Sequence, residues 1–347
     1  MTKRLRLFPR YKYPWPVLFF TAAAAGIAVL SGSLALPAAE DQVQTEPVEE
    51  WSELARLAPK SLLLDATLFD KKITAVGERG HVLVSEDGGV NWTQVRTPTR
   101  SLLNAVAAVD GRYAWAVGHD AVILHSADGG STWSRQHYAP EEGTPLLDVW
   151  FENKSHGIAV GAYGLFLETQ DGGTTWEKRV VDEEERHWNA IAGSQDGTLY
   201  VAAESGVVFR SSDKGKSWDL LETSYKGSFL GLICLSDGPV LVFGLRGNVF
   251  RSSDRGDTWQ DIATDTTVSL LGGTQCSDGT AVIVGLSGTL LISQDMGLSF
   301  HAVNRPDRKA LGAVVEPNPG SLLLFGENGV NLVEDASIRP SNFCIRS

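Results

Sequence analysis

The sequence lacks the residue clusters on which metal and phosphate sites depend. Its 7 histidines are dispersed, without a His-x-His or His-Glu-x-x-His pattern, and it contains only 3 cysteines and 2 methionines. No Lys-Ser or Lys-Thr directly follows a Gly-x-x-Gly segment, as a phosphate-binding loop would require. We therefore predict no metal site, no bound cofactor and no catalytic residues.

Basic residues are also fewer than acidic residues. The 347 residues include 30 Lys and Arg against 42 Asp and Glu, a net charge of −12. The first 36 residues carry five of the basic side chains and no acidic ones, which leaves 25 basic against 42 acidic residues, or −17, for the rest. Nucleic-acid phosphates and anionic lipid head groups repel so acidic a body, and nucleic-acid binding is not expected. With 43% apolar and 21% charged residues, global disorder is excluded.

A long uncharged run follows the basic N-terminus. The basic residues end at Lys12, and residues 17–36 carry no charge, a pattern typical of an export signal and long enough to span a bilayer. Residues 1–36 are therefore predicted to be a cleaved signal peptide or a retained membrane anchor, and both alternatives stay open. No Cys lies near the cleavage region, which excludes lipid attachment there. The positive-inside rule places the remainder outside the cytoplasm, in the periplasm or on the periplasmic face of the inner membrane, after an acidic linker at 37–50.

The rest of the chain is a repeat. The segment Ser-Glu-Asp-Gly-Gly-Val-Asn-Trp at 85–92 recurs five times, with its aspartates 41, 43, 42, 41 and 41 residues apart. Ten residues before each aspartate stands a small-x-x-small motif such as Gly77…Gly80, and a seventh copy at Gly326…Gly329 has no such segment after it. The repeated residues are Asp87, Asp128, Asp171, Asp213, Asp254 and Asp295, and Trp92, Trp133, Trp176, Trp218 and Trp259.

Each repeat contains four short apolar runs separated by Gly and Asp turns, which predicts four strands. Four strands in about 41 residues are typical of a propeller blade. We therefore predict an all-β, seven-bladed β-propeller with four-stranded blades over residues 51–335, followed by a tail at 336–347. Trp51 precedes Gly77 by 26 residues, the same spacing as from Trp92 to Gly118. A strand near Trp51 is thus expected to complete the last blade beside residues 330–333.

The repeated aspartate segment, or Asp box, is interpreted as structural. A tight turn needs an acceptor for its backbone N–H groups, which Asp supplies, and a residue that tolerates positive φ, which Gly supplies. The Ser and Thr hydroxyls add local hydrogen bonds, and the Trp packs against the neighbouring blade. No catalytic role is assigned to these aspartates.

The Gly-x-x-Gly motif, the apolar strand and the Asp box, at a period near 41 residues, resemble one family. They look like the photosystem II stability/assembly factors, over roughly residues 51–335. The resemblance implies a non-enzymatic exported scaffold that binds a membrane-protein complex or its subunits. Similar proteins in non-photosynthetic bacteria, found beside transporter genes, extend the range of clients to a transporter. The cyanobacterial relatives are typically lipoproteins, whereas this chain lacks the required Cys. We expect a monomer.

Sialidases and some other glycoside hydrolases also carry Asp boxes. Sialidases need three arginines, a Tyr nucleophile with its Glu, and an Asp acid, and they usually begin with an Arg-Ile-Pro motif. This chain has no Arg-Ile-Pro, and its regular spacing leaves no room for inserted catalytic loops. An Asp-box glycoside hydrolase or sialidase-like protein is kept as the alternative function.

Ligands of propellers usually meet the face that carries the inter-blade loops and the turns between second and third strands. In this chain those turns are the residue pairs inside the small-x-x-small motifs, which differ between repeats. The inter-blade loop at 181–187 carries four consecutive acidic residues that could attract a basic partner, although solvated turns and loops without a partner are the alternative. The candidate partner-binding residues are Arg79, His119, Tyr163, Arg246, Glu327, Glu183, Glu184 and Glu185.

Overall fold

The computed structural model describes residues 50–69 and 71–334. The predicted signal or anchor at 1–36, the linker up to residue 49 and the tail at 336–347 lie outside these residues. Within the described residues, no helix is long and apolar enough to cross a membrane.

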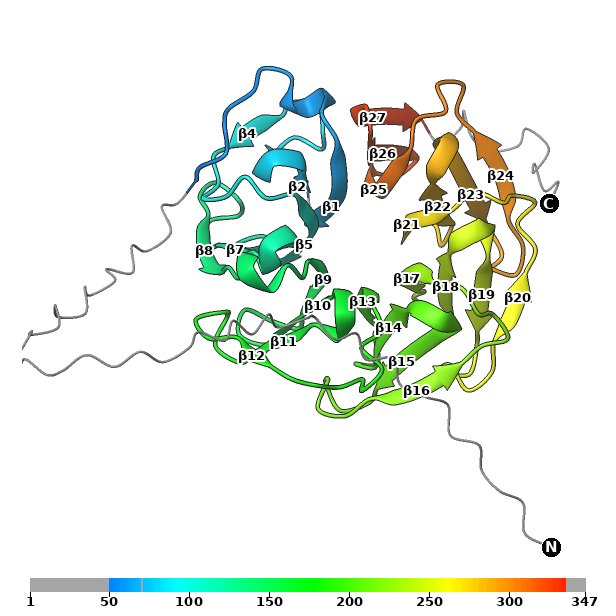
Figure 1. Ribbon diagram of the computed structural model, residues 1–347. Helices are drawn as coiled ribbons and strands as arrows, with labels where there is room; N and C mark the ends of the chain where they lie inside the picture. Colours follow the sequence, from blue (N-terminus) through cyan, green and yellow to red (C-terminus); the bar gives the residue numbers. More distant parts are fainter. Residues whose placement is uncertain (1–49, 70, 335–347) are drawn as a thin grey trace, which may run out of the picture. The chain divides into compact units, whose positions relative to one another are not determined.

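Seven antiparallel sheets surround a central axis and form the blades of a β-propeller (Figure 1). Within each blade the strands are hydrogen-bonded in chain order, from an inner first strand to an outer last strand. Each first strand contacts the first strand of the next blade, and β25 contacts β1, so the ring is closed. The predicted seven-bladed all-β fold is confirmed.

The first four blades have four strands each. Blades 1 and 2 consist of β1 (Leu63–Phe69), β2 (Lys72–Gly77), β3 (Val82–Ser85), β4 (Thr93–Val95), β5 (Leu103–Val109), β6 (Tyr113–Gly118), β7 (Ile123–Ser126) and β8 (Ser134–His137). Blades 3 and 4 consist of β9 (Leu146–Phe151), β10 (Gly157–Gly161), β11 (Phe166–Thr169), β12 (Glu177–Lys178), β13 (Trp188–Gly193), β14 (Leu199–Ala203), β15 (Val207–Ser211) and β16 (Asp219–Glu222).

Among the described residues, the last blade has one strand fewer than the others. Blades 5 to 7 consist of β17 (Phe229–Cys234), β18 (Val240–Gly244), β19 (Val249–Ser252), β20 (Gln260–Ile262), β21 (Leu270–Gln275), β22 (Ala281–Gly285), β23 (Thr289–Ser293), β24 (His301–Asn304), β25 (Leu311–Asn318), β26 (Ser321–Gly326) and β27 (Gly329–Glu334). The short 3-10 turns are η1 (Ala58–Lys60), η2 (Glu78–Gly80), η3 (His119–Ala121), η4 (Pro140–Glu142), η5 (Ala162–Gly164), η6 (Glu204–Gly206), η7 (Leu245–Gly247) and η8 (Leu286–Gly288).

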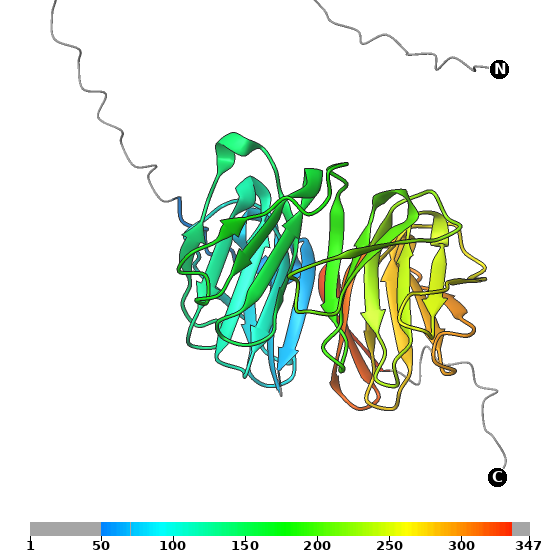
Figure 2. The ribbon, with the colours of Figure 1, turned by 90° about the horizontal axis from the view of Figure 1, so that it is seen from below.

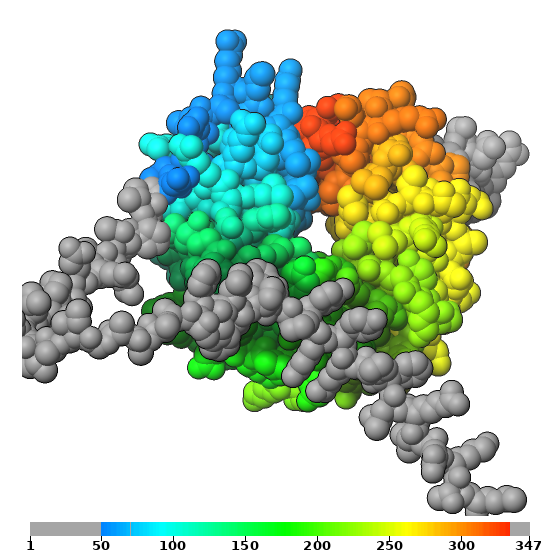
Figure 3. Space-filling model, in the orientation of Figure 1, coloured from blue at the N-terminus to red at the C-terminus, as the bar shows by residue number. Residues whose placement is uncertain are grey.

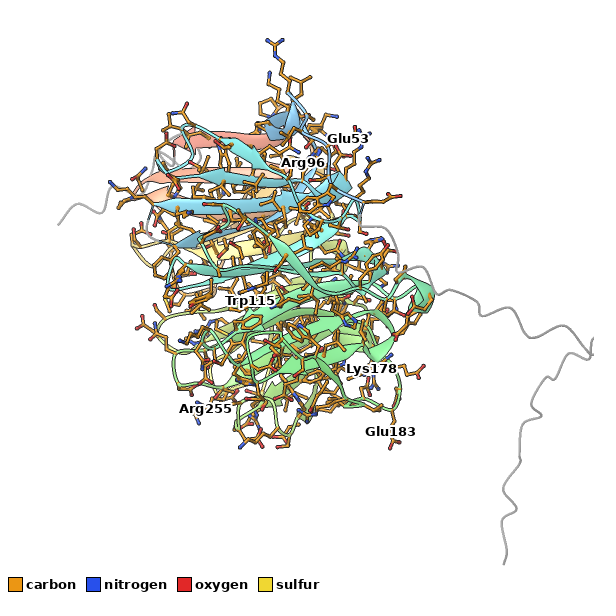
Figure 4. The ribbon with its side chains drawn as sticks, turned by 90° about the vertical axis from the view of Figure 1, so that its left-hand side faces the viewer. Glu53, Arg96, Trp115, Lys178, Glu183 and Arg255 are labelled. Carbon is orange, nitrogen blue, oxygen red and sulfur yellow. The ribbon has the colours of Figure 1, made fainter. Side chains whose placement is uncertain are left out.

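The second strand of each blade is buried on both faces because neighbouring blades cover it. Every residue of β10, β14, β18 and β22 is buried, which explains why these strands appear in the sequence as continuous apolar runs. Large aromatic rings fill the spaces between blades. Trp115, labelled in Figure 4, stacks on Phe151 of the next blade with ring centroids 3.5 Å apart. The fourth strands are short and largely polar because they face solvent.

The Asp box forms a rigid turn between the third and fourth strands. In blade 2, Asp128 Oδ1 accepts hydrogen bonds from Ser126 Oγ at 2.8 Å and Thr132 N at 2.9 Å, while its Oδ2 accepts one from Thr132 Oγ1 at 2.6 Å. Trp133 then packs against Val84 and Val95 of blade 1. The same wedge recurs around the ring, and Trp92 packs edge-on against Phe325 of blade 7, with ring centroids 5.9 Å apart.

The prediction that a strand near Trp51 completes the last blade is wrong. Ser52 N donates to Thr97 O at 2.8 Å and Thr97 N donates to Ser52 Oγ at 2.9 Å, which holds this segment at the end of blade 1. The side chain of Gln94 also forms two hydrogen bonds with the backbone of this segment, one at Glu53 and one at Ala55. These hydrogen bonds place the segment on blade 1, although the spacing of Trp51 had predicted a place on blade 7. Blade 7 instead meets blade 1 through an apolar cluster that includes Leu63 and Phe325.

The blades enclose a central cavity of about 300 Å³, visible as the opening in Figure 3. On one side, alternating Asp and Asn side chains tie neighbouring first strands together. Asp65 Oδ2 accepts from Val106 N and Asp148 Oδ2 accepts from Ile191 N, both at 2.8 Å. On the first strands that follow each of them, Asn104 Nδ2 donates to Leu146 O and Asn189 Nδ2 donates to Phe229 O, both at 2.7 Å.

On the other side of the cavity, glycines allow the first strands to approach each other directly. A Cβ on Gly272 would lie 2.1 Å from Gly312 O, and a Cβ on Gly312 would lie 2.5 Å from Leu64 O. Any side chain at these two positions would therefore force the strands apart.

The cavity carboxyls are predicted to make stability depend on pH. Desolvation raises the pKa of Asp65 to about 6, and desolvation with the charge of Asp65 raises the pKa of Asp148 to about 7. Their contribution to stability is therefore full below the ordinary value of 3.8 and is lost as the pH rises through 6 to 7. We expect the unfolding temperature to fall between pH 4 and pH 7, and to fall less in Asp148→Asn. Equal slopes in scanning calorimetry of the two proteins would contradict this assignment.

Loss of one Asp box should destabilise the ring without changing its fold. Asp128→Ala removes three hydrogen bonds that hold the wedge, and we expect a loss of about 1–2 kcal/mol in the free energy of unfolding. Asp261 is an exposed aspartate on β20, and Asp261→Ala is the matched control, with an expected change within about 0.5 kcal/mol. Urea unfolding of both variants measures the difference, and equal midpoints would show that the box does not stabilise the ring.

Candidate partner-binding face

The turns between second and third strands form a repeated frame at one end of the ring. In blades 1 to 6 each is a single 3-10 turn, drawn as a coil, and Figure 2 shows the coils at the same end of the blades. The first position of the motif has to be glycine in blade 2, because the backbone there lies against the preceding loop. A Cβ on Gly118 would lie 2.0 Å from Leu102 O.

The second residue of each pair lies at the tip of its turn in the left-handed region. Its φ lies between 53° and 62° in all six turns, although none of these residues is glycine. This conformation costs about 1 kcal/mol for a residue with a side chain, and the surrounding frame maintains it. The tip residues are Arg79, Asp120, Tyr163, Ser205, Arg246 and Ser287.

The structure places the predicted turn residues on this face but on different blades. Arg79, Tyr163 and Arg246 are exposed tips on blades 1, 3 and 5, and His119 is the first residue of the turn on blade 2. Glu327 belongs to the two-residue turn of blade 7, where it is exposed. These residues are therefore spread around the ring and do not form a single cluster.

Several polar side chains of the turns hold neighbouring loops in place. Asp120 Oδ2 accepts from Ser101 Oγ at 2.5 Å, and Glu78 Oε1 accepts from Leu62 N at 3.4 Å. Glu204 Oε2 accepts from His187 N at 3.1 Å. These three acidic residues stabilise the adjacent inter-blade loops. Glu327 is also paired, since its Oε2 lies 3.4 Å from Lys309 Nζ.

Tyr163 and the acidic loop come together between blades 3 and 4. Tyr163 is 63% exposed and packs edge-on against His187, with ring centroids 4.8 Å apart. His187 Nδ1 in turn lies 3.4 Å from Glu204 Oε1. The loop returns to the same turn, because Gly164 N donates to Arg186 O at 2.9 Å.

The four acidic residues of this loop have different surroundings. Asp182 is buried and accepts from Arg186 Nη1 at 2.7 Å and from Arg186 N at 3.1 Å. Glu184 accepts from Arg186 Nη2 at 2.5 Å. Glu183 and Glu185 are exposed, and Figure 4 shows Glu183 at the periphery of the ring. Only these two acids are thus free of the Arg186 ion pairs.

Two leucines on blades 5 and 6 add an apolar part that the candidate residues missed. Leu245 and Leu286 hold equivalent first positions in their turns and are 37% and 40% exposed. The signal was present in the sequence, since an apolar residue in an otherwise polar turn is unusual. The face therefore combines acidic groups on blades 3 and 4 with apolar groups on blades 5 and 6.

The described part of the chain contains no group of three or more His, Cys, Asp or Glu placed to hold a metal ion. Cys276 is buried, and burial raises the pKa of Cys234 to about 12, which keeps the Cys234 thiol protonated. Cys344 lies outside the described residues.

The closed ring, the repeated Asp boxes and the face of variable turns define an Asp-box β-propeller. A family model described as "Photosynthesis system II assembly factor YCF48" matches residues 43–141 and 140–315. The chain belongs to this family.

Two curated relatives are named as assembly factors. The photosystem II assembly lipoprotein Ycf48 of Prochlorococcus marinus (strain MIT 9312) is 32% identical over 139 residues, which cover 40% of this chain and 41% of the relative. The chloroplastic photosystem II stability/assembly factor HCF136 of Oryza sativa subsp. japonica is 27% identical over 125 residues, which cover 33% and 30%. The matches thus span less than half of each relative.

Solved propellers share the fold. A structure titled "YCF48 bound to D1 peptide" has a TM-score of 0.66 and 19% identity, and the match covers 82% of this chain and 96% of the other. The WD40 propeller domain of Doa1 gives a TM-score of 0.64 at 13% identity, covering 82% and 95%.

The Asp182–Arg186 pair is predicted to keep the acidic loop closed. Asp182→Ala removes the acceptors of Arg186 Nη1 and Arg186 N, and we expect trypsin to cleave after Arg186 at least several-fold faster. Glu183→Ala is the control, because Glu183 is exposed and outside this network, and its cleavage rate should equal that of the wild type. Equal rates for all three proteins would show that the pair does not hold the loop.

Proposed function

We propose that this propeller is a non-enzymatic assembly or accessory factor that binds a subunit of a membrane-protein complex through its face of turns. The single observation that carries this proposal is membership of the YCF48 family, whose curated relatives are named as photosystem II assembly factors. One family structure carries a bound D1 peptide by its title, and it supports a polypeptide ligand for this chain.

The chemistry of the face supports an extended polypeptide segment as the ligand. Glu183 and Glu185 favour a basic stretch, and Tyr163 offers a ring beside them. Leu245 and Leu286 favour apolar residues further along the same segment. A juxtamembrane segment, in which basic residues adjoin apolar ones, has this composition.

The predicted export signal supports action outside the cytoplasm, at the membrane if the N-terminal segment is retained. The client is then a subunit exposed on that side, belonging to a photosynthetic complex or to a transporter of a non-photosynthetic bacterium. We propose a monomeric scaffold, because the first strands of the seven blades close into one ring within a single chain.

Capture of the client tests this function. We expect the wild-type chain to co-purify a membrane-protein subunit from native membranes after crosslinking. The double variant Glu183→Lys, Glu185→Lys should reduce the yield at least several-fold. Asp237→Lys is the matched control, because this exposed aspartate lies in a turn at the opposite end of blade 5. Equal yields from all three proteins would remove the acidic loop from the interface.

The glycoside hydrolase alternative is tested separately with a panel of fluorogenic glycosides. We expect no turnover above a buffer control. Robust turnover that survives repeated purification would overturn the scaffold function.

A further inference from the structure

A groove of about 430 Å³ lies between blades 1 and 2, beside the outermost strand β4 of blade 1 (Figure 1). Val84 on β3 and Val95 on β4 give the groove an apolar side. The rest of its lining is polar and comes from β4 and from the Asp boxes of blades 1 and 2. The polar lining residues are Glu86, Asp87, Asn91, Thr93 and Ser131.

The two valines hold positions that repeat in the other blades. Val84 stands directly before the Ser or Thr that begins the Asp box. In blade 4 this position is Arg210, whose Nη1 donates to Arg255 O at 2.8 Å and to Asp257 Oδ1 at 2.7 Å, both in the Asp box of blade 5. In blade 5 it is Arg251, and its side chain likewise bonds to the Asp box of blade 6. Long side chains at this position therefore tie one blade to the Asp box of the next.

The second valine position, the third residue after the Trp of the Asp box, has the same role in blades 2 and 3. Arg179 Nη1 donates to Gly215 O at 3.0 Å, and its Nη2 donates to Lys216 O at 2.8 Å, in the Asp box of blade 4. Gln136 Nε2 donates to Gly172 O at 2.9 Å, in the Asp box of blade 3. Four successive interfaces, from blade 2 to blade 6, thus contain a side chain that donates to the next Asp box.

The interface between blades 1 and 2 lacks such a bond. Among the described residues, no side chain of blade 1 donates a hydrogen bond to the Asp box of blade 2, whose Gly130 O accepts from Trp133 of its own blade. Ser131, which lines the groove, is the counterpart of Asp257 and Lys216, two residues that accept such bonds elsewhere. The groove therefore lies where a donating side chain is present in the other interfaces.

The polar side of the groove supplies acceptors for a cation. The side chain of Glu86 is 75% exposed and lies 3.3 Å from Lys72 Nζ through Oε1, while its Oε2 has no partner among the described residues. Asn91 Nδ2 donates to Asp87 Oδ2 at 2.7 Å, which leaves the amide oxygen of Asn91 as a further acceptor. The other five Asp boxes have Ser or Thr at this position, without an amide oxygen. Hydrogen bonds from the backbone and the side chain of Asn91 lower the pKa of Asp87 to about 2, so this carboxylate is charged at neutral pH.

We propose that this groove binds an arginine side chain of a polypeptide partner. The guanidinium donates to Glu86 and Asn91, and the aliphatic stem lies against Val95. Arginine fits both sides, because its planar guanidinium presents several donors in a fixed geometry and its stem covers apolar surface. The partner's arginine then takes the place that Arg179 and Arg210 hold in their own interfaces.

The groove and the face of turns lie at opposite ends of β3. The turn Glu78–Gly80 precedes this strand, and the Asp box of blade 1 follows it. The groove is therefore a second contact site, and it does not depend on the function proposed for the turns.

Saturation-transfer NMR of the full chain, with N-acetyl-arginine methylamide as the probe, tests the groove. We expect a transfer signal with the wild type that falls at least several-fold in Val95→Arg, because the new side chain fills the groove as Arg179 fills its interface in blade 3. Val303→Arg is the matched control. Val303 holds the equivalent position in blade 6 and packs toward blade 7, whose segment of the sequence has no Asp box, and the signal should not change.

A second variant keeps the test decisive if Val95→Arg fails to fold. Glu86→Gln changes an exposed side chain, and it should reduce the signal of the arginine probe at least several-fold. Glu222→Gln, at an exposed position of β16, is its control and should leave the signal unchanged.

Two further probes separate guanidinium recognition from other binding. The citrulline analogue keeps the shape of arginine without its charge, and the lysine analogue keeps the charge without the planar fork, so both should give signals at least several-fold weaker. Either analogue matching the arginine probe would overturn the proposal. So would the absence of an arginine signal with the wild type, or equal signals from the wild type, Glu86→Gln and any folded Val95→Arg chain.

Discussion

The contact between neighbouring blades is the interaction on which the whole ring depends, and the Asp box creates it. The carboxylate of Asp128 fixes a turn, and the turn presents Trp133 to the preceding blade as a rigid wedge. The box glycine is part of the same contact, because a Cβ on Gly89 would lie 2.2 Å from Leu323 of blade 7. The same wedge is present where the ring closes, since Trp92 packs on Phe325 in the way that the other wedges pack on their neighbours.

The contact between neighbouring blades also determines at which positions the residues can differ from blade to blade. Around the axis, the first strands are either linked by side chains such as Asp65 and Asn104 or in direct contact at glycines such as Gly272. Neither arrangement admits other side chains, and the second strands are buried between blades. The tips of the turns are surrounded by this frame but make few contacts with it. Their side chains therefore differ from blade to blade while the frame of the turns stays the same.

The repeat was sufficient to predict the number of blades, the strands and the face that carries the candidate residues, because each of these follows from a period of about 41 residues. It failed at the end of the ring. Trp51 has the spacing of a fourth-strand Trp, but Ser52 and Gln94 attach its segment to blade 1. Spacing records where a residue stands in a repeat, and it contains no information about polar contacts between segments more than 40 residues apart.

By itself, the sequence determined the seven-bladed ring and the positions of the small-x-x-small turns and the Asp boxes, since local hydrogen bonds and apolar periodicity act within a single repeat. Only the tertiary structure decided which polar side chains are free. Glu78, Asp120 and Glu204 are tied to loops beside their turns, and Asp182 is buried against Arg186 while Glu183 is exposed. The physical reason is that the bonds of Glu78, Asp120 and Glu204 join residues from different loops, whereas the Asp182–Arg186 pair depends on how its own loop folds back. The first three pairings depend on how the blades bring the loops together, and consecutive acidic residues look alike in the sequence.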